Sequence, residues 1–316
     1  MYFYMNRNQI YIILLVFFTS FLAEAQDYER VDATIQLYPT SFNAAEELSA
    51  FITRDFISEE EKVRAIYTWI IMNVAYEPDE YKQFNYNFKN YRERNLKEEK
   101  TREKIIKRTL EKGIAVCEGY AMLFERLCEL QGITSYLVRG DIKTNFNDIG
   151  RPFKNTHMWN VVTIEGQSYL YDPTWGAGKY HGKFIKEPSY FYYKTPPNLF
   201  AKTHCPQMQE DALLTETLTR EDFAAMPLVI QEQLTLNDID NPKKGLISSR
   251  EGDGFVNFNV RNVKPSKIEY SYGADKKTLE FSNGEDAISF VIPIELGKEN
   301  LLIYFDDKPA LGYKIK

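Results

Sequence analysis

Residues 113–121 read Gly-Ile-Ala-Val-Cys-Glu-Gly-Tyr-Ala, and much of the fold can be inferred outward from them. Cys117 begins a segment whose apolar residues recur at helical spacing, and Gly132 suits the end of that helix. At the first turn of a helix, the macrodipole and the unpaired backbone N–H groups stabilise a thiolate. A lone cysteine is more often a small buried hydrophobe, so Cys117 needs support from other residues to count as a nucleophile.

His157 and Asp172 supply that support. The chain on either side of Glu165-Gly166 has the composition of two strands, and these two residues suit a short hairpin turn. Such a hairpin places His157 and Asp172 on one face as diagonal neighbours, about 7–8 Å apart at the backbone. The pattern fits equally well a histidine and an aspartate on the surface whose positions along the strands happen to place them on the same face of the sheet.

Together the three side chains suit nucleophilic attack on a carbonyl. Cys117 would attack as a thiolate, and His157 would take the thiol proton and later give one to the leaving amine. Asp172 would hold the imidazole tautomer and stabilise the imidazolium.

The other histidines and cysteines fit this chemistry less well. His181 lies in a Gly- and Lys-containing loop, and His204 precedes Cys205. A metal or redox pair of His204 and Cys205 stays open, although the sequence contains no CxxC or HExxH motif. Cys117 and Cys128 are separated by about 16 Å along one predicted helix, so only Cys205 could pair with either of them.

The flanking sequence predicts a mixed α and β chain. Ser58 and Glu61 form a capping box at the start of an apolar helical pattern. We expect helices at about 44–56, 59–73, 100–112 and 220–225, an exposed charged insertion at 79–98, and strands at 134–139, 156–164 and 168–172. Strand-like runs at 228–236, 255–260, 267–272, 288–294 and 301–305 predict a β-sandwich of about 90 residues.

The composition excludes several classes of protein. The 316 residues are 44% apolar and 27% charged, which is typical of globular chains rather than disordered or collagen-like ones. A net charge of −6 argues against a dedicated nucleic-acid binder, which usually has a basic face. Three cysteines are too few for a disulfide scaffold and three histidines leave little for a metal site, so we expect no cofactor.

The candidate residues lie in segments that resemble the transglutaminase-like superfamily. Residues 113–121 are similar to its nucleophile motif. His157-Met-Trp-Asn-Val-Val and Tyr171-Asp-Pro-Thr-Trp-Gly-Ala-Gly are similar to its histidine and aspartate motifs, in the same order. Residues 65–76 resemble the helix that precedes the nucleophile.

The form of the aspartate motif, with Tyr190-Phe-Tyr and residues 200–206 downstream, points to the kyphoscoliosis-peptidase-like branch. The resemblance covers residues 45–225. The insertion at 79–98 departs from the family pattern, and so does Met158, where the family often has a small residue.

The resemblance implies an α+β fold with a papain-like core, in which the nucleophile helix packs on an antiparallel sheet that bears the histidine and aspartate. It implies thiol acyl transfer, either amide cleavage or exchange onto an amine, with Cys117, His157 and Asp172 as the triad. Candidate oxyanion or cleft residues are Trp69, Tyr76, Trp159 and Trp175.

The N-terminus predicts export. Residues 10–23 are an apolar run too short to span a bilayer, and Ala23-Glu24-Ala25 has the form of a signal-peptidase site. We expect a signal peptide over 1–25, a transglutaminase-like domain over 26–225 and a β-sandwich domain over 226–316, in a periplasmic or extracellular protein. An uncleaved N-terminal anchor is the alternative.

Two classes of function follow from these observations. The first is an exported thiol peptidase, amidase or acyltransferase that acts on protein or peptide amides, with hydrolysis and amine transfer both open. The second is a catalytically silent binding or assembly module that uses the β-sandwich for recognition. Neither class involves nucleic acid or an integral membrane segment after signal cleavage, and the oligomeric state stays open.

Overall fold

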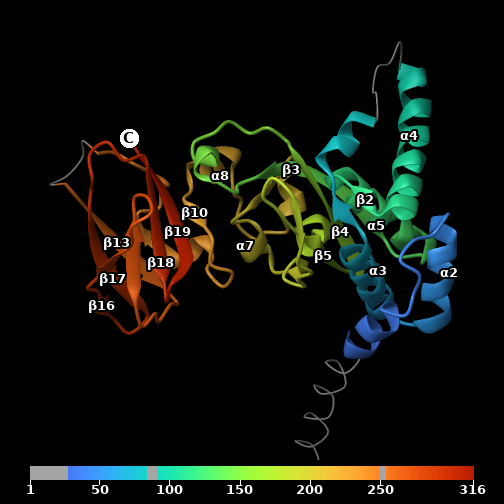
Figure 1. The fold of residues 1–316 in the computed structure, drawn as a ribbon, viewed down its shortest axis with the longest axis horizontal. Coiled ribbons are helices and arrows are strands. Elements are labelled where there is room, and N and C mark those ends of the chain that lie inside the picture. Colours follow the sequence, from blue (N-terminus) through green and yellow to red (C-terminus); the bar gives the residue numbers. More distant parts are fainter. Residues whose placement is uncertain (1–27, 84–90, 250–253) are drawn as a thin grey trace, which may run out of the picture. The chain divides into compact units, whose positions relative to one another are not determined.

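The computed structural model describes residues 28–83, 91–249 and 254–316 (Figure 1). The chain forms two compact units: unit 1 comprises residues up to 137 with 159–193, and unit 2 comprises 138–158 with 194–316. Helices and an antiparallel sheet make up the region that contains the predicted site, and all-β sheets follow toward the C-terminus. The predicted α+β fold class is therefore confirmed.

The first helices of unit 1 follow the apolar pattern of the sequence. A helical segment at residues 28–35 precedes α2 (Ala45–Asp55) and α3 (Glu59–Asn73). The capping box is present, since the Ser58 hydroxyl accepts the Glu61 N–H and the Glu61 carboxylate accepts the Ser58 N–H. The helices predicted at 44–56 and 59–73 are confirmed, and α3 is buried along most of its length.

Helix α4 (Tyr91–Lys112) is longer than predicted, because it begins at Tyr91 rather than near residue 100. The expectation that the insertion at 79–98 is exposed throughout is also partly wrong. Glu80 is only 6% exposed and forms an ion pair with Arg108 of α4, in which Arg108 Nη2 lies 2.9 Å from Glu80 Oε1. A charge pattern alone does not reveal that a carboxylate will be buried against a cationic partner. Residues 84–90 of the insertion lie outside the described part.

Helix α5 (Cys117–Leu130) packs against α2, α3 and α4 in unit 1. A Cβ at Gly119 would lie 2.6 Å from Ala115 Cβ and 2.7 Å from Thr109 Oγ1, so glycine is needed for this close approach. Gly132 follows the helix with φ +72°, the left-handed conformation predicted for its end. All three cysteines of the chain are free thiols, and Cys128 and Cys205 are buried.

One sheet has the strand order β8-β5-β4-β3-β9, and the division between the units falls within β3, β4 and β8. Its strands are β3 (Ser135–Ile142), β4 (His157–Ile164), β5 (Gln167–Tyr171), β8 (Tyr193–Thr195) and β9 (His204–Pro206). Ile164 pairs with Gln167 across a two-residue turn, in which Glu165 and Gly166 have φ of +51° and +81°. The predicted hairpin is therefore confirmed together with its register.

In unit 2, two antiparallel-paired sheets enclose an apolar core. One contains β10 (Leu228–Val229), β19 (Lys308–Ile315), β18 (Asn300–Phe305), β14 (Ile268–Ser271) and β15 (Lys277–Leu279), with β12 (Leu246–Ile247) parallel to β19. The other contains β11 (Ile239–Asn241), β13 (Phe255–Arg261), β17 (Ala287–Pro293) and β16 (Ser282–Asn283). Stacked rings of Phe258 and Phe290, 5.0 Å apart, lie in this core.

Two strand predictions in this region need correction. The run at 228–236 is a strand only at Leu228–Val229, because the chain turns at residues 231–233. Strand β19 was not predicted at all, since Pro309 and Gly312 interrupt its pattern. Its register with β18 shifts between Ile303 and Tyr304, which accommodates that interruption.

The other described elements are the parallel pair β1 (Ala75–Tyr76) and β2 (Ile114–Ala115), the pair β6 (Gly178–Tyr180) and β7 (Phe184–Lys186), the helices α6 (Pro173–Ala177), α7 (Pro197–Phe200) and α8 (Arg220–Ala225), and 3₁₀ turns at Pro78–Gln83, Phe146–Asp148, Gln209–Ala212 and Leu236–Asp238.

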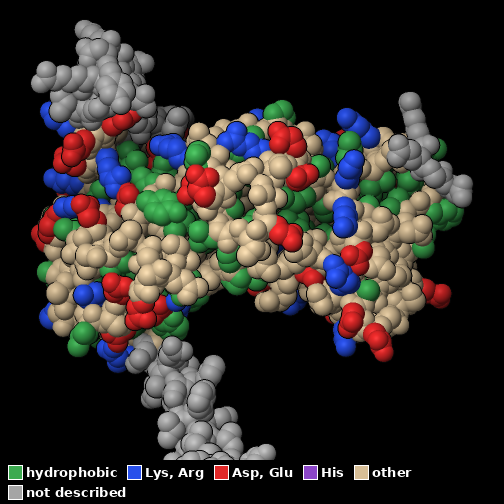
Figure 2. Space-filling view, turned by 180° about the vertical axis from the view of Figure 1, so that it is seen from behind, with side chains coloured by type: hydrophobic (Ala, Val, Ile, Leu, Met, Phe, Trp, Pro, Cys, Tyr) green, Lys and Arg blue, Asp and Glu red, His purple; other side chains and the backbone are tan. Residues whose placement is uncertain are grey.

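Among residues 28–83, 91–249 and 254–316, no helix is both long and apolar enough to cross a membrane. The predicted signal peptide, residues 1–25, lies outside the described residues. Figure 2 shows acidic and basic side chains interspersed on one face of the molecule.

Buried tyrosines make the fold sensitive to alkali. Burial raises the pKa of the phenol well above its usual value of 10 in Tyr67, Tyr120, Tyr171, Tyr193 and Tyr313. In an unfolded chain these phenols ionise near pH 10, so the stability they contribute is complete below about pH 10 and is lost as the pH rises toward the folded-state pKa. We expect a steep late phase of tyrosine absorbance at 295 nm that coincides with loss of circular dichroism.

A Tyr313→Phe variant tests this assignment, because it should reduce the amplitude of the steep phase. Titration of all 22 tyrosines near pH 10 in protein that is still folded would contradict it.

Candidate active site

Cys117 is the first residue of α5, as the sequence predicts, and its side chain is half-buried. Val116 precedes it in an extended conformation, and no side chain caps this end of the helix. The backbone N–H groups of Cys117 and Glu118 belong to this first turn, while that of Gly119 donates to Val116 O at 2.9 Å. Such donors and the helix macrodipole favour negative charge on sulfur or on an oxygen bound next to it.

Tyr76 lies near this thiol. It ends β1, which pairs with β2 just before Cys117, and Tyr76 is aligned with Ala115. Burial raises the pKa of Tyr76 to about 12, and negative charge on Cys117 and on Tyr180 adds to the rise. The phenol therefore keeps its proton at neutral pH and is available to donate near the sulfur. This placement suits the oxyanion or cleft role predicted for Tyr76.

Asp172 follows β5 and caps α6. Its Oδ1 accepts the backbone N–H groups of Thr174 at 2.9 Å and Trp175 at 3.0 Å, and its own N–H donates to Tyr192 O at 3.0 Å. The carboxylate is fully buried. Negative charge on Asp172 also contributes to the raised pKa values of Tyr67 and Tyr120, which therefore lie close to it.

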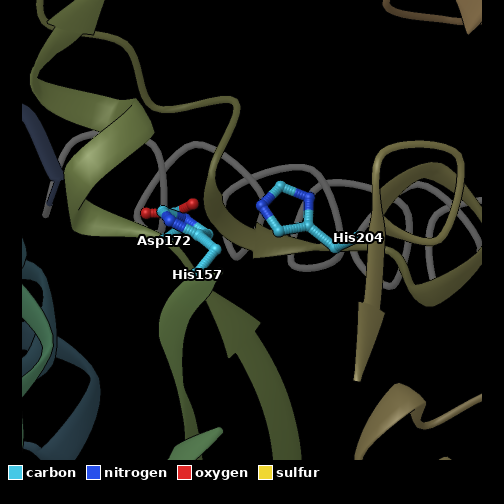
Figure 3. A group of neighbouring side chains, drawn as sticks. All are labelled: His157, Asp172 and His204. Atoms are coloured by element: carbon cyan, nitrogen blue, oxygen red, sulfur yellow. The ribbon is translucent and has the colours of Figure 1, made fainter. Parts of the chain in front are cut away.

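His157 is the first residue of β4 and His204 is the first residue of β9; both belong to unit 2, whereas Asp172 belongs to unit 1 (Figure 3 labels the three side chains). Donor atoms of the three side chains lie within 4.8 Å of one another, and all three residues are buried. The imidazole rings of His157 and His204 are 5.6 Å apart between centroids. Cys117 is not a member of this group.

Packing in unit 1 connects Cys117 with Asp172. Helix α5, which Cys117 begins, packs against α6, which Asp172 caps. Tyr120 lies three residues after Cys117 and therefore on the same side of α5. The charges of Asp172 and Tyr76 both act on the Tyr120 phenol. The nucleophile candidate and the carboxylate thus approach the same region of the α5 surface.

The tryptophans named from the sequence occupy different environments. Trp69 is fully buried, and its indole N–H donates to Pro39 O at 2.9 Å, so this donor is already used within the core. Trp159 is also fully buried, in β4. Trp175 is half-buried in α6 and contacts Tyr192 edge to face at 5.3 Å. Of these three, Trp175 has the exposure that a cleft residue requires.

Sequence reasoning missed the place of His204. His204 precedes Cys205 in the sequence and shows no pattern that links it to His157, yet β9 pairs with β3 and brings the two imidazole centroids to 5.6 Å from each other. The one signal that could have identified it is the similarity of residues 200–206 to the kyphoscoliosis-peptidase-like branch. Asn160 was also passed over. It is fully buried and its amide donates to Ala121 O at 3.0 Å, which attaches β4 to the second turn of α5.

The comparison with protein families agrees with this geometry. Residues 46–173 match the transglutaminase-like superfamily, and the matched range includes Cys117, His157 and Asp172. The chain contains a transglutaminase-like core. Its helices and antiparallel sheet are the elements that carry the three candidate residues.

The chain is distantly homologous to kyphoscoliosis peptidase. The mouse protein (Mus musculus) is 31% identical over 202 residues, which is 62% of this chain and 28% of that protein. The human protein (Homo sapiens) is 30% identical over 206 residues, which is 63% of this chain and 29% of that protein. The match thus spans less than a third of these curated relatives.

Among solved structures, a transglutaminase crystal structure aligns with 53% of this chain and 37% of its own, at 17% identity and a TM-score of 0.28.

Gly176, in α6, allows this helix to pack closely against the side chain of Tyr67. A Cβ at Gly176 would lie 2.1 Å from the Tyr67 hydroxyl oxygen, and Tyr67 is fully buried and donates to Ser189 O at 3.2 Å. We expect Gly176→Ala to destabilise the protein by about 1–3 kcal/mol through overpacking. Thermal unfolding followed by circular dichroism measures the effect.

Gly273→Ala is the matched control. A Cβ at Gly273 meets no atom within 4 Å, so we expect its midpoint to stay close to wild type. Equal midpoints for the two variants would show that α6 can move away from Tyr67 at no cost.

Proposed function

We propose that the chain is a thiol-dependent enzyme that transfers the acyl group of a protein or peptide amide, with Cys117 as nucleophile, His157 as base and acid, and Asp172 as the orienting carboxylate. The observation that carries the proposal lies within unit 1: Cys117 begins α5, and α5 packs against α6, the helix that the buried Asp172 caps. Similarity to proteins named kyphoscoliosis peptidase supports amide chemistry as the reaction class.

In the first half of the reaction, the Cys117 thiol proton passes to His157 and the sulfur adds to the amide carbonyl carbon. Backbone N–H groups at the start of α5 and the Tyr76 phenol are the donors available to the oxyanion. The C–N bond then breaks, the amine leaves with the proton from His157, and the acyl group remains as a thioester on Cys117.

In the second half, water or a second amine attacks the thioester and gives its proton to His157. The C–S bond breaks, the product leaves as an acid or a new amide, and His157 returns a proton to the thiolate. Asp172 stabilises the imidazolium in both halves, and its two bonds from the α6 backbone hold it in place.

The competing proposal is a catalytically silent binding module. Loss of catalysis leaves a fold intact, because function belongs to the site and not to the fold. The two proposals differ in the reactivity of Cys117, which can be measured without knowledge of the substrate.

We expect iodoacetamide at pH 6.5 to label Cys117 at least about tenfold faster in wild type than in His157→Ala, because the thiolate is the nucleophile and the imidazole takes its proton. Peptide mass spectrometry reads the modified residue. Cys128 and Cys205 are internal references, since both are buried and burial raises the thiol pKa, in Cys205 to about 11. His181→Gln changes an exposed histidine and should label like wild type. Equal rates in wild type and His157→Ala would favour the binding module.

Activity itself is best tested on casein with and without a fluorescent primary amine. Incorporation of the amine reports transfer, and new peptide N-termini report hydrolysis. We expect Cys117→Ala to abolish whichever activity is present, while Cys128→Ser, which alters a thiol on the same helix, retains activity if it folds. A Cys117→Ala protein with full activity would rule out the proposed nucleophile.

A further inference from the structure

The β6–β7 hairpin packs against β1, the strand that ends at Tyr76, and all three strands belong to unit 1. Tyr180 pairs with Phe184, and Lys186 follows two residues later, so these three side chains share one face of the hairpin. This face is directed at the rest of unit 1, because Phe184 packs on the apolar core and the Lys186 side chain donates to Val74 O. The hairpin therefore covers β1 with the face that carries Tyr180.

The opposite face of the hairpin is directed at solvent. It carries Lys179 and Ile185, which pair with each other. Ile185 is 42% exposed, and Lys179 forms an ion pair with Glu187 at 3.1 Å on the surface. Ile185 and Tyr180 thus lie on the same hairpin in different surroundings.

Helix α6 holds the base of the hairpin. Strand β6 begins at Gly178, directly after α6, and beyond β7 the Glu187 N–H donates to Ala177 O at 3.2 Å. The Ser189 N–H then donates to Gly176 O at 2.8 Å. Because both ends are bonded to α6, the hairpin is positioned before a ligand arrives, which lowers the entropy cost of a contact with it.

Tyr180 is separated from the candidate nucleophile by one aromatic ring. The rings of Tyr180 and Tyr76 meet edge to face, with centroids 5.8 Å apart. Tyr76 is aligned with Ala115, and Cys117 follows Ala115 by two residues, so Tyr76 and Cys117 share a side of the β1–β2 pair. The charges of Cys117 and Tyr180 both act on the Tyr76 phenol, which agrees with this order.

The Tyr180 ring is 45% exposed, so much of its apolar surface is open to a ligand. Aromatic rings pack favourably with other aromatic or aliphatic groups, and such contacts remove apolar surface from water. An extended peptide advances about 3.3 Å per residue. A side chain one or two positions from an amide bound at Cys117 therefore extends past Tyr76 to Tyr180.

We propose that Tyr180 is a specificity-determining residue, whose ring packs against an aromatic or large aliphatic side chain close to the amide that Cys117 attacks. The identity of the ligand as an amide rests on the proposed function. The contact of Tyr180 with an apolar group held at Cys117 does not depend on it.

The test compares two alkylating probes, iodoacetamide and N-benzyl-iodoacetamide, which share a reactive group and differ by one aromatic ring. The rates at Cys117 are read by peptide mass spectrometry on the full chain at pH 7.5, and the same two rates on glutathione give the intrinsic ratio. We expect the benzyl probe to be favoured at Cys117 by at least about fivefold over that ratio, which is the order of an aromatic pair contact.

The variants separate the contact from the stability of the hairpin. Tyr180→Ala should return the ratio to that of glutathione, and Tyr180→Phe, which retains the ring, should keep most of the preference. Ile185→Ala is the matched control, because it shortens an exposed side chain on the opposite face, and it should keep the wild-type ratio.

Three results overturn the assignment. A wild-type ratio equal to that of glutathione shows that no apolar group is bound beside Cys117. An unchanged ratio in Tyr180→Ala shows that the ring only packs on Tyr76. An equal loss in Ile185→Ala shows that the ratio follows the stability of the hairpin.

The proposed function fails on a different measurement, which is an equal rate of iodoacetamide labelling in wild type and His157→Ala. The ratio of the two probes within one variant does not depend on that result. Where casein is cleaved or modified, we expect the reacted positions to lie close to aromatic or large aliphatic residues, and Tyr180→Ala to reduce this preference. Reacted positions without such neighbours overturn the specificity role and leave the proposed triad standing.

Discussion

The buried carboxylate of Asp172 is the group on which the site depends. Its Oδ1 accepts two N–H groups of α6, and its own backbone N–H donates to Tyr192 O. A fully buried carboxylate without such partners would cost several kcal/mol, so the surrounding hydrogen bonds are a condition of its presence. Because Asp172 is held in place, an imidazole that interacts with its carboxylate must lie at a defined position beside it.

Aromatic packing keeps this carboxylate away from water. Tyr67 and Tyr171 contact each other, and Phe124 of α5 packs on Tyr171 at 5.5 Å. Gly176 allows α6 to approach Tyr67 to a distance that no other residue permits. The aspartate motif therefore combines a buried carboxylate with a packing requirement at Gly176, about one helical turn later, and both are met by the same short helix α6.

Local signals predicted the parts of the site that local structure determines. The start of α5 at Cys117 follows from its apolar spacing, and the pairing of Ile164 with Gln167 follows from a two-residue turn, which fixes strand register. His204 could not be predicted in this way, because the three-residue strand β9 reaches β3 through tertiary pairing across more than sixty residues. Glu80 and Trp69 were misplaced for a related reason, since their partners Arg108 and Pro39 are distant in sequence.

The arrangement of the three thiols has a consequence for oxidative damage. Oxidation of Cys117 to a sulfenic acid is normally reversed when a nearby cysteine forms a disulfide with it. Cys128 is about 16 Å away along the same helix. Cys205 is buried, and its pKa is raised to about 11, so its sulfur is protonated and a poor nucleophile. Neither can act as a resolving cysteine, and recovery of an oxidised Cys117 depends on a thiol supplied from outside the chain.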